Sequence, residues 1–379
     1  MIRIEEITGR RALAKFVEFQ IELYKGNPNY VPPLIKVEVD NFDININPSM
    51  QVGEMVFYMA YDEANKPVGR IAGIINNRYN KKSGVRVCRF GYVDFIDDRS
   101  VSRALFDAVV KWGKFQGMTT LVGPLGMTDL DREGALIDGF DQLSAMATIY
   151  NYPYYIEHYK AYGFKMEEDT VWEEYSFPMP EKLDQKHLAI AEFVKSHYHL
   201  KSFCMKDLKV AKSNYGPKIF ELLNKTYSML DYVSELDQKQ IEYYIDSWLR
   251  IVPLDLIGIV TNDRDEVVAF GITAPSLSKA FQKAQGHFFP FGWFHVLKSI
   301  YWKGGSDIWD LMLIAVHPDY QGKGVSTLLF AELFESGQKH KFKWVSPYPQ
   351  LVRNYGIHSH WKAFNAKVNR RRATFKKLI

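Results

Sequence analysis

The sequence predicts a mixed α/β protein made of two domains of similar plan. The chain has 379 residues, which is long enough for two domains of ordinary size. Hydrophobic residues make up 47% and charged residues 24% of the chain, a composition typical of globular proteins. The same order of strand-like and helix-like stretches occurs twice. We therefore expect domains at residues 1–180 and 181–379, each with a mixed central sheet flanked by helices.

The first half carries periodic patterns that define its elements. Residues 101–117 place apolar side chains on one helical face, and residues 56–77 hold two β-rich runs around a polar turn, which indicates a hairpin. The prolines of "NPNYVPPL" end the helix before them. We expect a strand, a helix, the hairpin, a strand, a helix, a strand and a closing helix–turn–strand unit at residues 2–7, 10–24, 56–77, 87–96, 101–117, 119–125 and 154–177.

The second half repeats this plan after a charged connector at residues 178–187 and a linking helix at 188–198. It is expected to hold a strand, two helices, a hairpin, a strand, a helix, a strand and a helix at residues 200–208, 217–230, 238–250, 254–274, 307–316, 326–340, 342–348 and 355–364. The last stretch, which contains "NRRRATFKK", predicts a closing strand with solvated cations rather than a nucleic-acid contact.

Bulk properties argue against several classes of protein. A net charge of +4 is too mild to indicate nucleic-acid binding. No apolar run is long enough to span a bilayer, and the first residues show no signal peptide. Cys88 and Cys204 form no disulfide framework and no metal site, so we expect a reduced, cytoplasmic setting. The sequence leaves the oligomeric state open.

A glycine loop lies between the expected strand at 307–316 and the helix that follows it. The first N–H groups of a helix have no partner within the helix, and together with the helix dipole they attract anions. Gly322 and Gly324 have no Cβ to keep a phosphate away, and Lys323 adds a positive charge. The spacing of a P-loop is absent, and a dinucleotide fingerprint would need a third glycine. A plain glycine turn is the alternative.

The stretch "LIAVHPDYQGKGVSTLLF" resembles the coenzyme A loop of the GNAT superfamily of acyltransferases. That family has Q/R-x-x-G-x-G/A after a strand with a V-x-P element, and Gln321, Gly324 and Ser326 fall on its three motif positions. The resemblance covers nearly the whole chain as a tandem of two GNAT-like domains. It implies acetyl-coenzyme A or another acyl-coenzyme A as co-substrate. The implied contacts come from the strand and the loop, at Ile314, Ala315, Val316, Gln321, Gly322, Lys323, Gly324, Val325 and Ser326.

The first half matches this family less well at the corresponding junction, "VDFIDDRSVSRALF". No glycine lies there, and Asp97 and Asp98 would repel a pyrophosphate. Later in the same half, Asn151, Tyr159 and the pair Gly163–Phe164 fit the end of a GNAT domain. We therefore expect a first domain whose phosphate loop is degenerate and does not bind coenzyme A.

The resemblance implies that an amine attacks the coenzyme A thioester directly. The base is expected to be Asp310, which by strand alternation shares a face with Met312, Ile314 and Val316. The donors expected to protonate the leaving thiolate are Tyr355, His358 and His360 in the second half and Tyr159 in the first half. A strand-end carboxylate, surface histidines and a core tyrosine are the alternative interpretations.

Two functions follow from the resemblance. The first is an acyl-coenzyme A-dependent N-acyltransferase acting on a small-molecule amine or a peptide. The second is a non-catalytic acyl-coenzyme A-binding or interaction protein on the same scaffold. Residues 279–305 are unusually rich in aromatics, and they predict a wall for substrate, packing between the halves or an interfacial helix.

Overall fold

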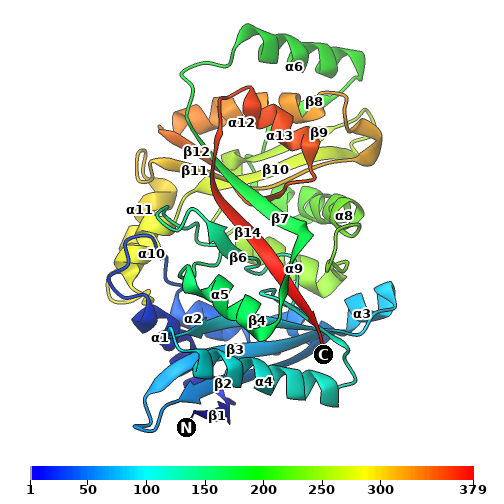
Figure 1. The fold of residues 1–379 in the computed structure, drawn as a ribbon. Helices are drawn as coiled ribbons and strands as arrows, with labels where there is room; N and C mark the ends of the chain where they lie inside the picture. Colours follow the sequence, from blue (N-terminus) through cyan, green and yellow to red (C-terminus); the bar gives the residue numbers. More distant parts are fainter. Residues whose placement is uncertain (1) are drawn as a thin grey trace. The chain divides into compact units, whose positions relative to one another are not determined.

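The structure is a computed structural model that describes residues 2–379, and it divides into two compact units (Figure 1). Unit 1 contains the chain up to residue 173 together with residues 278–293 and 369–379. Unit 2 contains residues 174–277 and 294–368. Each unit has a mixed sheet flanked by helices, which confirms the predicted fold class.

The sheet of unit 1 combines antiparallel strands with one parallel pair. Its order is β1–β2–β3–β4–β5–β14, in which β4 and β5 are parallel, and β6 adds to β14. The predicted hairpin forms β2 and β3, with Gly53 opposite Asn76 at one end and Tyr61 opposite Pro67 at the other. The strands are β1 (Arg3–Glu6), β2 (Gly53–Tyr61), β3 (Pro67–Asn76), β4 (Val87–Phe95), β5 (Thr120–Gly123), β6 (Ala135–Asp138), residues 165–173 of β7 (Lys165–Pro178) and residues 369–378 of β14 (Lys367–Leu378).

The helices of unit 1 bury the apolar faces that the sequence predicts. Leu105, Phe106 and Val109 of α4 are fully buried against the sheet, and each such side chain stabilises the fold by about 1.5–3 kcal/mol. The helices are α1 (Arg10–Leu23), α2 (Ile35–Asn41), α3 (Asn77–Ser83), α4 (Arg99–Phe115), α5 (Tyr154–Tyr162), α10 (Ser278–Ala284) and the 3₁₀ turn η1 (Pro48–Val52).

The basic C-terminal stretch forms β14, so the predicted closing strand is confirmed. Its residues Phe375 to Leu378 pair antiparallel with β5. The expected solvation of its cations is wrong for two of them. Arg370 and Arg372 are buried, and they donate to the carbonyls of Leu143 and Ile149, respectively.

The sheet of unit 2 has the order β7–β12–β11–β10–β9–β8, in which β11 and β12 are the parallel pair. Its strands are residues 174–178 of β7, β8 (Lys201–Cys204), β9 (Ile257–Thr261), β10 (Val267–Pro275), β11 (Ile308–Val316), β12 (Trp344–Pro347) and the short β13 (Gln350–Leu351). The helices are α6 (Gln185–His197), α7 (Leu208–Val210), the π-helical turn η2 (Ala211–Tyr215), α8 (Gly216–Tyr227), α9 (Gln238–Trp248), η3 (Leu254–Leu256), most of α11 (Gly292–Tyr301), η4 (Pro318–Tyr320), α12 (Val325–Lys339) and α13 (Tyr355–Lys362).

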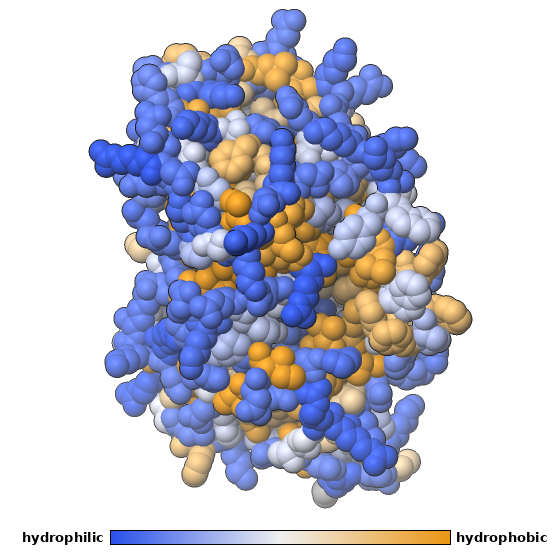
Figure 2. Space-filling view, turned by 180° about the vertical axis from the view of Figure 1, so that it is seen from behind, coloured by the Kyte–Doolittle hydropathy of each residue, from blue (hydrophilic) through white to orange (hydrophobic). Residues whose placement is uncertain are grey.

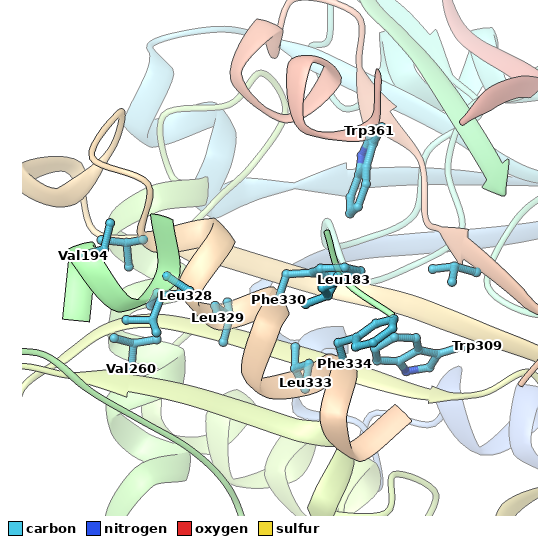
Figure 3. Close-up of a cluster of buried hydrophobic side chains, with 14 of the residues drawn as sticks. Leu183, Val194, Val260, Trp309, Leu328, Leu329, Phe330, Leu333, Phe334 and Trp361 are labelled. Carbon is cyan, nitrogen blue, oxygen red and sulfur yellow. The ribbon is translucent and has the colours of Figure 1, made fainter. Parts of the chain in front are cut away.

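Helix α12 lies against one face of this sheet, and Figure 3 shows its leucine and phenylalanine side chains between Val260 and Trp309 of the strands and Val194 of α6. The close approach depends on the cross-strand pair Gly258 and Gly271. A Cβ on either glycine would come within 2.8 Å of Leu333. These two positions therefore let the middle of α12 pack closely on β9 and β10.

Candidate functional site

Strand β11 contains a bulge that no pattern in the sequence indicates. Leu313 pairs with Ile272 of β10, but Thr273 pairs with Leu311, so Met312 is an extra residue on β11. A bulge breaks the ladder locally and reverses the alternation of side chains beyond it. The bulge therefore decides which side chains of β11 share a face.

The expected side-chain alternation along β11 is wrong for this reason. Ile314 pairs with Gly271, the glycine that faces α12, and Leu311 and Ile314 both pack in the core beneath α12. Asp310 precedes the bulge and points to the opposite face. It therefore shares that face with Leu313 and not with Ile314.

The parallel pairing of β11 and β12 ends at the same place. The last pair is Leu311 with Pro347, followed by a hydrogen bond from the Tyr348 amide to the Leu311 carbonyl. Among the described residues, β11 has no strand partner on this side after that point. The carbonyls of Ile314 and Val316 instead accept from the side chains of Tyr227 (3.1 Å) and Gln321 (3.0 Å). Since an antiparallel strand residue turns its N–H and C=O to the same side, the amides of Ile314 and Val316 also face this open edge.

The glycine loop joins β11 to α12 and leaves its amides available. Gly322 and Gly324 have φ values of 72° and 79°, in the left-handed region that favours glycine. Within residues 2–379, no loop or cap hydrogen bond to a backbone carbonyl uses the amides of residues 322–326, and Gly324 gives the helix no side-chain cap. The Lys323 ammonium lies 5.4 Å from the Tyr198 ring centroid and 5.6 Å from that of Tyr320. Free amides, a helix dipole and a cation together suit an anion.

Gly324 also has a packing role. A Cβ at this position would lie 3.0 Å from Val194 and 3.2 Å from Ile190, both on α6. A Cβ on Gly322 would meet nothing within 4 Å. Substitution of Gly324 therefore affects the contact between α6 and α12 as well as any ligand, whereas substitution of Gly322 affects the loop alone.

Asp310 is 2% exposed, and the Tyr348 hydroxyl donates to its Oδ2 at 3.3 Å. Tyr348 follows β12 directly, and the pairing of Asp310 with Ser346 brings the two side chains together. Sequence reasoning missed Tyr348, because its position depends on the register between two strands far apart in the chain. The carboxylate thus lies beside the point where β11 and β12 separate.

The other candidates in the second half are the expected proton donors Tyr355, His358 and His360. Tyr355 begins α13, and its side chain is 78% exposed. His358 is buried, with one ring nitrogen 2.8 Å from the Tyr175 hydroxyl and the other 2.8 Å from the Leu351 carbonyl. Because a carbonyl oxygen only accepts, Nε2 donates to Leu351, and Nδ1 faces the Tyr175 hydroxyl, so both nitrogens have structural partners. The side chain of His360 lies outside the described residues.

Tyr159 belongs to unit 1, where it lies in an aromatic core. Its ring centroid is 5.7 Å from that of Phe90 and 5.0 Å from that of Phe375. Burial raises the pKa of its hydroxyl well above the ordinary value for tyrosine. Asn151, from the same motif region, bonds the Leu136 backbone through both its oxygen and its nitrogen. These surroundings favour the packing role for Tyr159.

An apolar cavity of about 30 Å³ lies on the face of the unit 2 sheet opposite α12. Its lining includes Phe220 of α8, Ile245 of α9 and Ile272 of β10, the residue opposite Leu313.

Comparison with known proteins shows which proteins and which fold this chain resembles. No protein-family model matches the chain. It is similar to Protein YghO of Escherichia coli (strain K12), with 23% identity over 394 residues that cover 99% of this chain and 95% of that protein. It is also similar to the bacterial ceramide synthase of Caulobacter vibrioides (strain NA1000 / CB15N), with 22% identity over 77% of this chain and 74% of that protein.

Among solved structures, a tandem GNAT protein from the clavulanic acid biosynthesis pathway matches 100% of this chain and 98% of its own, with a TM-score of 0.59 and 10% identity. At that identity the likeness concerns the fold. The chain therefore has the fold of the GNAT superfamily of acyltransferases, in tandem form.

Proposed function

We propose that the protein is an acyl-coenzyme A-dependent N-acyltransferase whose co-substrate binds in unit 2. The observation that carries the proposal is the N-terminus of α12, where the amides of residues 322–326 have no carbonyl partner and Lys323 adds a positive charge. A pyrophosphate would accept from these amides. Gln321 supports the site by closing the loop onto the Val316 carbonyl.

The open edge of β11 supports the chemical step. The amides of Ile314 and Val316 face this edge, so we expect them to bind the pantetheine arm and to polarise the thioester carbonyl. The amine nitrogen attacks the carbonyl carbon, a C–N bond forms and the C–S bond breaks. Asp310, directly or through water, takes the proton of the amine. The departing thiolate takes a proton from a hydroxyl, for which Tyr348 and Tyr355 are the candidates in unit 2.

The acceptor is proposed to be a small-molecule amine or a peptide. The relative named as a ceramide synthase supports amide formation, because ceramide is an amide. A non-catalytic acyl-coenzyme A-binding protein is the second candidate function. It is favoured by His358, whose two nitrogens are both bonded, and by Tyr159, which lies in the core of unit 1.

Calorimetric titration of Ser326 variants with acetyl-coenzyme A tests the proposal. Ser326 is the second residue of α12. An added carboxylate about 5 Å from a phosphate opposes binding by about 3 kcal/mol at an effective dielectric constant of about 20, which corresponds to about a 10²-fold loss of affinity. Ser326→Asp should therefore bind far more weakly, and Ser326→Ala should bind like the intact protein. The Asp variant should keep its melting temperature, because a carboxylate in the first turn favours the helix dipole.

Three outcomes separate the candidates. Acetyl-coenzyme A binding followed by amine-dependent release of free thiol supports the transferase. Binding without thiol release across a panel of amines and peptides supports the non-catalytic protein. No heat from the intact protein, or equal affinity in Ser326→Asp, would contradict the assignment of the loop.

A further inference from the structure

Residues 287–303, called the aromatic segment below, expose a dense group of apolar side chains. The segment holds four phenylalanines, two tryptophans and a tyrosine. It supplies eight of the 24 exposed large apolar side chains among residues whose side chains are described. Phe291 is 74% and Tyr301 67% exposed, and Figure 2 shows orange and pale side chains gathered at the edge of the face on which α11 lies. Scattered exposed apolar residues need no explanation, but a contiguous group indicates an interaction surface.

Helix α11 is apolar on both of its faces. Val296 and Ile300 are buried. Phe294, Leu297 and Tyr301 recur at helical spacing on another side and are exposed. Apolar side chains that gather on an exposed helix face are typical of an interaction surface. The outward face of α11 is therefore built for an apolar partner.

The turn before α11 is ordered by its own hydrogen bonds. The Trp293 amide donates to the Phe288 carbonyl at 2.7 Å, and its indole N–H donates to the Pro290 carbonyl at 2.8 Å. Phe289 and Phe291 project from this turn, 73% and 74% exposed. Rings presented on a fixed backbone lose little conformational entropy when they are buried.

The charged residues around the aromatic segment indicate which kind of partner it binds. Residues 267–306 contain no aspartate and no glutamate, whereas they contain Lys279, Lys283, Lys298 and Lys303. All four lysines are exposed, and the Lys298 ammonium lies 5.8 Å from the Trp302 ring centroid. Protein interfaces are depleted of lysine. A lipid surface, in contrast, takes aromatic rings at the headgroup level and attracts lysines to its negative charge.

We propose that the aromatic segment docks the protein onto the surface of a bilayer that contains anionic phospholipid. Phe289, Phe291, Tyr301 and Trp302 enter the boundary between headgroups and acyl chains, and Lys298 and Lys303 lie at the level of the phosphates. The contact is peripheral. None of the helices described in residues 2–379 is long and apolar enough to cross a membrane.

Co-sedimentation with vesicles tests the docking surface on the full chain. Vesicles of equal parts phosphatidylcholine and phosphatidylglycerol should pellet the protein, and vesicles of phosphatidylcholine alone should pellet less of it. The double variants Phe289→Ser/Phe291→Ser and Tyr301→Ser/Trp302→Ser should each lower the partition coefficient by about tenfold or more, since each ring removes apolar surface from water when it enters the bilayer surface. Lys298→Glu/Lys303→Glu should reduce binding to the anionic vesicles only.

A matched control comes from Phe115 at the end of α4, which is 86% exposed and lies outside the segment. Phe115→Ser should bind vesicles like the intact protein. All variants change exposed side chains, so their melting temperatures should agree. The proposal is overturned if the intact protein does not bind anionic vesicles or if both double variants bind as well as it does. It is also overturned if the segment instead mediates self-association, seen in sedimentation velocity as a dimer that the same variants abolish.

Discussion

In each unit a helix follows a bulged strand, but the N-termini of the two helices are capped differently. In unit 1, β4 has one residue more than β3 between the pairs Asp94–Arg70 and Gly91–Ala72, and α4 follows it. In unit 2, β11 has the extra Met312, and α12 follows it. The scaffold is shared, so the difference lies in the residues that cap the two helices.

At α4 the protein supplies its own anion. The Asp98 carboxylate accepts from the Ser100 amide at 2.7 Å, and the neighbouring Asp97 lies 2.9 Å from a ring nitrogen of His158. At α12 the capping residue is Gly324, which has no side chain to offer. The comparison shows that one fold can either cap its helix amides with a side chain or leave them without such a cap.

The largest expected effect concerns the acid at the bulge of unit 2. Asp310 lies two residues before Met312 at the bulge of β11. At the bulge of β4, Tyr92 has a positive φ, and the residue two positions before it is the buried, apolar Phe90. Asp310→Asn keeps the shape and removes the proton acceptor. Turnover should fall by about 10²-fold, and acetyl-coenzyme A affinity should be unchanged. Steady-state rates across pH with a fixed amine test this, and an unaltered profile would remove Asp310 from the mechanism.

The second prediction separates the two glycines of the loop. Gly324→Val places a β-branched residue at a φ of 79° and against Val194, so it should abolish acetyl-coenzyme A binding and also destabilise the protein by about 1–2 kcal/mol. Gly322→Ala has open space, so it should keep more of the stability and show the effect of the loop on affinity. Urea unfolding and calorimetry of both variants measure the two effects. Equal stability of Gly324→Val and the intact protein would contradict the packing role.

The third prediction breaks the internal cap of unit 1. Asp98→Ala should destabilise the protein by about 1 kcal/mol at neutral pH, the usual effect of losing an N-cap. It should leave acetyl-coenzyme A binding unchanged, since the site is assigned to unit 2. Gained binding in unit 1 after this substitution would show that the carboxylate alone had blocked a second site.

The Asp98 cap also predicts that the stability of the protein depends on pH. The hydrogen bonds from Ser100 hold the pKa of Asp98 below its ordinary value. A carboxylate with a lowered folded-state pKa stabilises the fold above its unfolded pKa of about 3.9, and this stabilisation is lost as pH falls through the folded pKa. The difference in urea midpoint between the intact protein and Asp98→Ala should therefore shrink as pH falls below about 4. A difference that is constant with pH would contradict a charged cap.

The sequence predicted those features that depend on residues close together in the chain. The glycine loop was visible because Gln321, Gly322 and Gly324 are close in sequence, and the helical face of α4 was visible from its periodicity. Met312 gave no signal, because a bulge is defined by the partner strand. The burial of Arg372 was missed for the same reason, since this part of β14 pairs with β6, where Leu136 is the partner of Arg372.

The smallest expected effect concerns Lys323, the cation that unit 2 places beside its open helix N-terminus. Its ammonium is exposed to solvent and held near Tyr198 and Tyr320, so water and salt screen its charge. Lys323→Gln should weaken acetyl-coenzyme A binding by about threefold at low salt, and the difference should vanish at high salt. Lys239→Gln, at an exposed position of α9, is the matched control and should bind like the intact protein. If Lys323→Gln loses affinity equally at low and high salt, the lysine acts by shaping the loop and not by its charge, and the contrast between the two helix N-termini then depends on backbone amides alone.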